Sequence, residues 1–91
     1  MPDVELYGGS GCQFTSDLRE QLLWENREFV EYDVETDEAA LRRMMALTGG
    51  QRGIPVLVEK GRIVQVGWQG RTCSVAPPPA LPDARSRDAS A

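Results

Sequence analysis

The sequence contains no histidine and only two cysteines, and these shortages exclude several kinds of site. Without an imidazole, the Cys-His nucleophile pair of cysteine proteases cannot form, and a zinc site would need carboxylates at a spacing that matches no known pattern. Cys12 and Cys73 are also too few for the disulfide framework of a small secreted domain. We therefore expect no metal site, and a reactive cysteine would need activation by a group other than histidine.

The chain also lacks a long apolar run and a cluster of basic residues. No window approaches the roughly 20 apolar residues of a membrane span, and the N-terminus has no basic region followed by an apolar stretch. Lys and Arg total 10 against 14 Asp and Glu, and the basic residues are scattered, which argues against binding to nucleic acid or to an anionic membrane. We expect a cytoplasmic monomer that acts on proteins or small molecules.

The patterns that are present alternate between strand and helix. Residues 3–7 alternate polar and apolar side chains and predict a strand, whereas residues 15–26 carry leucines at helical spacing and predict an amphipathic helix. Residues 28–34 are rich in β-branched and aromatic side chains and predict a second strand. Because a helix connects them, the two strands are expected to be parallel.

A second helix and a hairpin follow. Residues 36–38 supply an N-cap candidate and an acidic first turn, and residues 49–50, both glycine, end the predicted helix. Two apolar runs, residues 56–59 and 62–66, flank the turn-forming pair at 60–61 and predict an antiparallel hairpin. A short helix or turn at the C-terminal end is expected to complete the domain.

The composition changes at residue 76, where a proline-rich stretch begins. Such a stretch, followed by small and charged residues, cannot form a core or a regular element. We therefore divide the chain into a folded domain, residues 1–75, and a flexible tail, residues 76–91. The tail is either a plain solvated terminus or a proline-rich ligand for another domain.

A cysteine lies between the glycine-rich residues 8–11 and the start of the first predicted helix. A thiol at a helix N-terminus faces unpaired backbone N–H groups, here those of Gln13, Phe14 and Thr15, and the positive end of the helix dipole. Both favour the thiolate and lower the pKa of Cys12 from about 8.5 toward roughly 3.5–7.5. The glycines would leave the sulfur uncovered, and the position offers little core for a merely apolar cysteine to fill. We therefore expect Cys12 to be a reactive nucleophile.

The order of elements, the cysteine after the first strand and the X-Pro pair before the third resemble a thioredoxin-like domain. Residues 47–58 look like the glutaredoxin segment that passes through a Thr-Val-Pro turn, here residues 53–55, into the third strand. Three stretches resemble a group of bacterial glutaredoxin-like proteins, some with selenocysteine at the position of Cys12: residues 8–15, 22–24 and 66–70. The resemblance covers most of residues 3–75 and implies an α/β, thioredoxin/glutaredoxin-like fold with a four-stranded mixed sheet.

The resemblance also implies a thiol-disulfide oxidoreductase. The thiolate of Cys12 would attack a protein disulfide or a glutathionyl sulfur, with glutathione as co-substrate. Dithiol members of the family have a second cysteine three residues after the first, where this chain has Thr15, so no local disulfide can form. Thr15 would either donate a hydrogen bond to the thiolate or help to start the helix. Cys73 would either resolve a mixed disulfide, which needs Cα atoms within roughly 7 Å, or pack in a final helical turn.

Further site residues follow from the same resemblance. The Ile54-Pro55 peptide would be cis and would leave the backbone of Ile54 free to pair with an extended, peptide-like thiol substrate. Gln51 and Arg52 would hold a glutathione carboxylate or lie in a solvated loop, and Trp68 would form an aromatic wall or simply pack. The predicted substrate or glutathione site consists of Gln13, Phe14, Gln51, Arg52, Ile54, Pro55, Gly67 and Trp68.

Two departures from the glutaredoxin pattern keep other functions open. No lysine precedes Cys12, and residues 67–71 lack the two aspartates that would hold the ammonium group of glutathione. Residues 12–15 are similar to the Cys-Gly-Phe-Ser site of cluster-binding monothiol glutaredoxins, which implies an iron-sulfur or glutathione-binding module as an alternative. A further alternative is a thioredoxin-fold adaptor that binds another protein through Trp68 and the tail.

Overall fold

The computed structural model describes residues 3–76, which form two helices and six strands. The predicted tail beyond Ala76 lies outside the described residues. In chain order the elements are β1 (Val4–Gly8), α1 (Gln13–Trp24), β2 (Val30–Asp33), α2 (Glu38–Thr48), β3 (Gly53–Ile54), β4 (Val56–Glu59), β5 (Arg62–Val66) and β6 (Cys73–Ser74).

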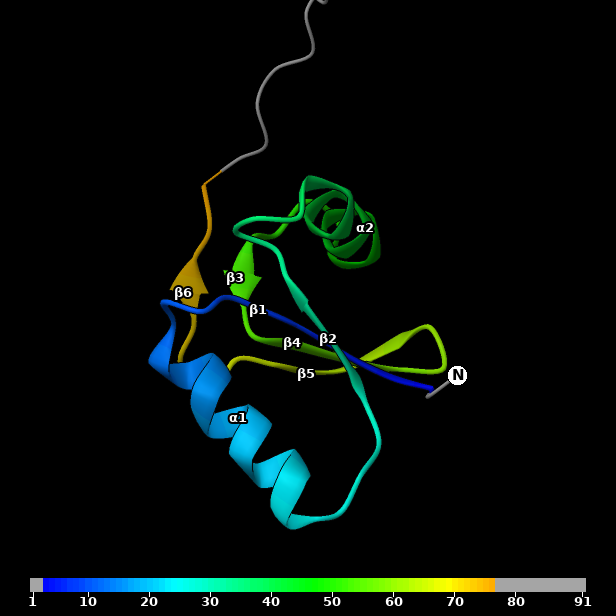
Figure 1. Ribbon diagram of the computed structural model, residues 1–91. Coiled ribbons are helices and arrows are strands. Elements are labelled where there is room, and N and C mark those ends of the chain that lie inside the picture. The colour runs from blue at the N-terminus through cyan, green and yellow to red at the C-terminus, as the bar shows by residue number, and fades with distance from the viewer. Residues whose placement is uncertain (1–2, 77–91) are drawn as a thin grey trace, which may run out of the picture.

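Four of the strands form a mixed sheet in the order β2-β1-β4-β5 (Figure 1). Strands β1 and β2 are parallel, as the intervening α1 requires, with Glu5 opposite Val30. Strand β4 pairs antiparallel with both β1 and β5. The fold is therefore the predicted α/β arrangement with a four-stranded mixed sheet.

Local signals set the ends of α2 and the hairpin turn. The side chain of Asp37 accepts a hydrogen bond from the backbone N–H of Ala40 at 3.1 Å, and Gly49 ends the helix with φ of 78°. Between β4 and β5, Lys60 and Gly61 both have positive φ, which is the geometry of a tight hairpin turn. These features confirm the predicted cap, stop and hairpin. Neither helix within residues 3–76 has the length and apolar character needed to cross a membrane.

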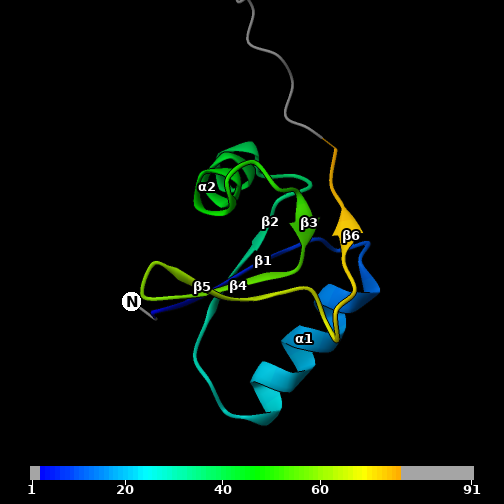
Figure 2. The same ribbon diagram turned by 180° about the vertical axis from the view of Figure 1, so that it is seen from behind.

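The sheet is covered on both faces (Figure 2), because its central strands send alternate apolar side chains to opposite sides. On one side, Leu6 and Leu57 pack with Leu18 and Leu22 of α1. On the other side, a larger cluster joins the sheet to α2, the loop before α1 and β6; its buried members are Tyr7, Cys12, Val34, Ala40, Leu41, Met44, Ile54, Val56, Val58 and Val75. The core thus has two halves, and the larger half reaches both cysteines.

The expected C-terminal helix or turn is present as a turn, followed by a strand. A turn is present at residues 68–71, where Trp68 and Arg71 exchange backbone hydrogen bonds of 2.8 and 3.0 Å. The residues after it form β6, which pairs antiparallel with β3. The placement of Cys73 in a helical turn is therefore wrong. The edge of β3 has backbone N–H and C=O groups that need hydrogen-bond partners. Pairing with an extended β6 supplies these partners, whereas a helix would bond only within itself.

Candidate functional site

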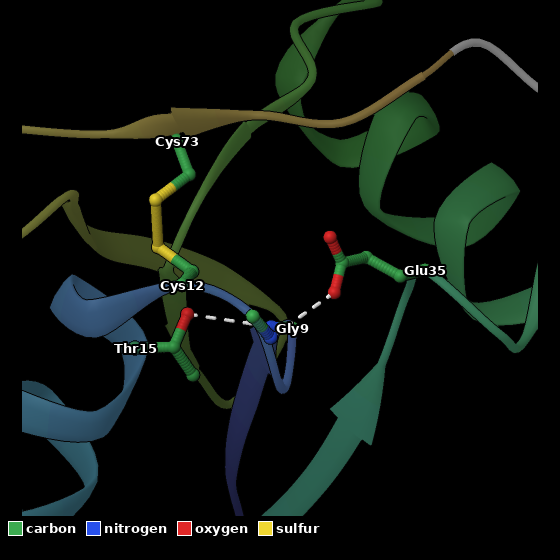
Figure 3. The surroundings of a disulfide bond; sticks show 6 residues. Gly9, Cys12, Thr15, Glu35 and Cys73 are labelled. Carbon is green, nitrogen blue, oxygen red and sulfur yellow. Dashed lines mark hydrogen bonds between the residues drawn. A yellow bond between two sulfur atoms is a disulfide. The ribbon is translucent and has the colours of Figure 1, made fainter.

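Cys12 and Cys73 are joined by a disulfide where β1 leads into α1 (Figure 3). Their Cα atoms lie 6.1 Å apart, within the usual range of about 4.4–6.8 Å for a disulfide. The distance condition set for Cys73 from the sequence is therefore met. The bond links the start of α1 to β6, two elements that are 61 positions apart along the chain.

The Cys12 side of this bond belongs to a helix N-terminus. Cys12 is the N-cap residue of α1, and its carbonyl accepts the N–H of Ser16 at 3.3 Å. Its side chain makes no capping hydrogen bond, and the first turn of α1 contains no acidic residue. The positive end of the helix dipole is thus not neutralised from within the helix, which favours negative charge on a nearby sulfur.

The sulfur environment differs from the uncovered loop that the glycines suggested. Cys12 is only 2% exposed and belongs to the same cluster as Ile54 and Val75, so the inference that it has little core to fill is wrong. The cause is β6, which lies beside β3 and next to the start of α1 in both views of the ribbon (Figures 1 and 2). Cys73 is partly exposed. Of the two bonded cysteines, Cys73 is therefore the one that solvent reaches.

Thr15 holds the loop that precedes Cys12. Its side chain is fully buried, and its Oγ1 accepts a hydrogen bond from the backbone N–H of Gly9 at 3.3 Å (Figure 3). A side chain at Gly8 would overlap with Thr15, so this approach of loop to helix requires glycine. Thr15 therefore positions the loop, and its hydrogen bond to a thiolate stays a prediction.

The predicted substrate edge is occupied by the chain itself. The Ile54-Pro55 peptide is cis, as predicted, but Ile54 lies opposite Cys73 in the β3–β6 pair and is not free in this state. Arg52 donates from Nη1 to the carbonyl of Val75 at 2.8 Å, and the side-chain oxygen of Gln51 accepts the N–H of Gly53. Both side chains predicted to hold glutathione thus contact the chain's own backbone.

The remaining predicted residues divide between the two halves of the core. Phe14 packs beside the cluster of Cys12, whereas Trp68 packs beside the leucine cluster under α1. Gln13 is exposed and donates to Asp17 one turn along α1 at 3.0 Å. Gly67 has φ of 85° and donates to the carbonyl of Pro55 at 2.6 Å, so it fixes the start of the turn toward β6. Trp68 thus packs against the core, and its role as an aromatic wall for a substrate stays a prediction.

Sequence reasoning missed Glu35, which follows β2. Its Oε1 accepts a hydrogen bond from the backbone N–H of Gly11, the residue before Cys12, at 3.4 Å. Figure 3 shows Glu35 beside this loop. The predicted parallel pairing of the first two strands could have indicated this contact, because the residues that follow β1 and β2 meet at one edge of the sheet. Glu35 therefore brings a carboxylate into contact with the loop that precedes Cys12. Within residues 3–76, no group of three or more His, Cys, Asp or Glu side chains is arranged to hold a metal ion.

Comparisons with solved structures show the same fold in other proteins. The thioredoxin-like protein BC3987 has 29% sequence identity and a TM-score of 0.62, with 72% of this chain and 88% of that chain covered. A glutaredoxin from Archaeoglobus fulgidus has 23% identity and a TM-score of 0.63, with 76% and 78% covered. A buckwheat glutaredoxin solved with glutathione has 14% identity and a TM-score of 0.61, with 72% and 61% covered.

Among curated proteins, none matches this sequence. The glutaredoxin family model, in contrast, matches residues 4–64, which span β1 through most of β5. The match includes Cys12 and the cis Ile54-Pro55 peptide, whereas Cys73 lies beyond its end. The family model covers two thirds of the sequence, and the chain belongs to the glutaredoxin family.

Proposed function

We propose that this protein is a thiol-disulfide oxidoreductase whose redox centre is the pair Cys12 and Cys73. The observation that carries the proposal is their disulfide, which joins the N-cap of α1 to β6. Membership of the glutaredoxin family supports the same class of reaction. Cys73 thereby supplies the second thiol that Thr15 cannot supply within the local motif.

The reduced protein reacts in two exchange steps. The thiolate of Cys12 attacks one sulfur of a substrate disulfide, and the other substrate sulfur leaves as a thiolate. The thiolate of Cys73 then attacks the sulfur of Cys12, the bond to the substrate breaks, and the substrate leaves as its second thiolate. The substrate disulfide is reduced to two thiols, while the protein is oxidised by two electrons to the Cys12–Cys73 disulfide.

External thiols return the protein to its reduced form through Cys73. Exposure supports this direction, because Cys73 is partly exposed whereas Cys12 is 2% exposed. A thiolate attacks the sulfur of Cys73, and the electron pair of the broken bond leaves on Cys12, where the N-terminus of α1 favours the charge. A second thiol then releases Cys73, and the two external thiols become one disulfide.

Glutathione, or another small thiol, is the proposed reductant, and a protein disulfide or a glutathione adduct is the proposed substrate. A family relative from buckwheat has been solved with glutathione bound, which supports this choice of thiol. We place the reaction in the cytoplasm, where small thiols keep such pairs reduced, and assign it to a monomer.

The test is intact-mass spectrometry after the reduced protein is treated with oxidised glutathione. We expect the wild-type protein to lose two hydrogens and to yield a peptide that links Cys12 to Cys73. The variant Cys73→Ser is the matched control, and we expect it to retain one glutathione on Cys12. Glutathione retained on Cys12 of the wild type, without a linked peptide, would contradict the two-cysteine cycle. Two unmodified cysteines would contradict the oxidoreductase itself.

A further inference from the structure

We infer that β6 is an internal copy of the substrate, and that the reduced protein binds extended polypeptides whose reacting cysteine is followed two positions later by a small aliphatic side chain. This inference rests on the proposed function, because it names the substrate class of the same site. It also implies that the oxidised protein is closed to substrate and that reduction opens it.

The backbone of β6 is bound as an added strand would be. It pairs antiparallel with β3, with Ile54 opposite Cys73. Directly after β6, the backbone N–H of Val75 donates to the carbonyl of Arg52 at 3.1 Å. The side chain of Arg52 donates in turn from Nη1 to the carbonyl of Val75 at 2.8 Å. Such main-chain pairing supplies affinity for any extended segment, while side-chain pockets supply specificity.

The side chains of this segment show what the pocket selects. Thr72 and Ser74 are exposed, whereas Cys73 turns to Cys12 and Val75 is 5% exposed in the cluster that also contains Cys12. This alternation is that of a strand with one face on the protein. The two side chains that reach the protein are thus the sulfur and the aliphatic group two positions later.

The other side chains of the segment contribute little apolar contact. Gly53, opposite Ser74, lies beside Thr72, and a cavity of about 400 Å³ is lined by residues 50–53 together with Thr72 and Ser74. Polar residues of varied size are therefore compatible with the positions on either side of the cysteine. We expect the protein to discriminate at the second position after the cysteine.

Reduction removes the strongest link that keeps β6 in place. Each strand of the β3–β6 pair is only two residues long, and pairs of this size are not stable alone in water. The segment leaves the sheet at a turn where Gly67, Gln69 and Gly70 all have positive φ. When a thiolate attacks Cys73 and Cys12 leaves as thiolate, β6 keeps its two-residue pair and the contacts of Val75 with Arg52 and the core, which are the contacts that a substrate strand can replace.

The first experiment measures the reaction of Cys12 with peptide probes in the full-length variant Cys73→Ser. The probe is the acetylated, amidated peptide Arg-Thr-Cys-Ser-Val-Ala, whose cysteine carries a thionitrobenzoate group as a mixed disulfide. Attack by Cys12 forms a bond to the peptide sulfur and releases thionitrobenzoate, which is measured by its absorbance. Two matched peptides replace the valine by serine or by N-methylvaline, so that one loses the aliphatic group and the other the N–H donor.

We expect the valine peptide to react about tenfold faster than either matched peptide, after each rate is divided by the rate with free glutathione. Normalised rates within about twofold of each other would overturn the inference. The same variant is also tested with the thionitrobenzoate adduct of glutathione. Absence of release from this adduct and from every peptide would contradict the proposed function, which separates the two failures.

A second experiment measures amide hydrogen exchange in the wild-type protein. In the oxidised protein we expect the Val75 amide to be protected by its bond to Arg52, and we expect this protection to fall at least about tenfold on reduction. The Val34 amide, which donates to Gly8 at 2.8 Å within the main sheet, is the internal control. Equal protection of Val75 in both redox states would show that β6 stays in place and would overturn the opening step.

Discussion

Two of the antiparallel strand pairs, β4–β5 and β3–β6, are built in opposite ways. Strands β4 and β5 are four and five residues long, adjacent in sequence and joined by a tight turn, and β4 is buried between its neighbours. Strands β3 and β6 have two residues each and lie apart in the chain, and a disulfide ties β6 to the N-cap of α1. The first pair depends on packing and local geometry, whereas the second depends on a bond that thiols can break. A redox-dependent site thus sits beside a redox-independent scaffold.

The largest expected difference between the two pairs comes from removing the covalent link. We expect Cys73→Ser to lower the free energy of unfolding by about 2–4 kcal/mol, since the bond restricts a long loop in the unfolded chain. Urea denaturation under oxidising conditions measures this. The neighbouring Ser74→Ala, at an exposed position, should change stability by less than about 0.5 kcal/mol. An unchanged midpoint for Cys73→Ser would mean that the disulfide contributes nothing to stability.

Two buried valines, one at each strand pair, test whether β6 is released on reduction. Val58 of β4 and Val75 beside β6 belong to the same cluster and are 0% and 5% exposed. We expect Val58→Ala to cost about 1.5–3 kcal/mol in both redox states, and Val75→Ala to cost a similar amount in the oxidised protein only. Urea denaturation with and without reductant measures both. A cost of Val75→Ala that survives reduction would contradict the release of β6.

Two glycines test the turns that lead into the second strand of each pair. Gly61 has φ of 79° and open space around it, so Gly61→Ala should cost about 1 kcal/mol from backbone strain alone. At Gly67, with φ of 85°, a Cβ would also lie 2.5 Å from the carbonyl oxygen of Arg71. We expect Gly67→Ala to cost at least about 1 kcal/mol more, measured by thermal unfolding. Equal costs would contradict the tight approach of the two backbone segments.

The smallest expected effect concerns Glu35. In Cys73→Ser, where Cys12 is the one thiol, we expect fast alkylation by iodoacetamide at mildly acidic pH, because the N-terminus of α1 favours the thiolate. Glu35→Gln removes a negative charge that contacts Gly11 and should raise this rate about twofold. The control is Glu28→Gln, because Glu28 is exposed and caps no helix. Asp37→Asn is unsuitable as a control, because Asp37 caps α2. A slower rate in Glu35→Gln would contradict a repulsive role.

These two strand pairs also show how far the sequence predicts the fold. The hairpin, the helix cap within residues 36–38 and the stop at Gly49 follow from short-range patterns, whereas the cis peptide before Pro55 was implied by the family resemblance, and the structure has all of them. Strands of two residues carry no periodicity, so β3 and β6 could not be predicted. The prediction that Cys12 is uncovered was wrong for the same reason, because the segment that covers it is distant in sequence.

The candidate site likewise combines features that short-range patterns predict with contacts between segments that are distant in sequence. Cys12 was predictable from its place before a helix, and the pairing with Cys73 was predictable only as a distance condition. Contacts of Arg52 and Glu35 depend on which strands become neighbours, which a single sequence does not state. The exposure of Trp24 was not predictable either, since it lies at the end of the amphipathic helix α1 but is 86% exposed. Helical spacing predicts which face of α1 is apolar, but not how much of that face the rest of the fold covers.

The disulfide also makes a ring of the polypeptide. Every element from α1 to β5 lies between Cys12 and Cys73, so both helices and most of the sheet are part of one covalent circle. A protease that cuts one peptide bond inside this circle leaves a nicked but undivided chain, whereas the same cut in the reduced chain yields two separate fragments. The redox state therefore decides whether a single cleavage divides the chain. In gel electrophoresis the nicked protein would run as one band without reductant and as two bands with reductant.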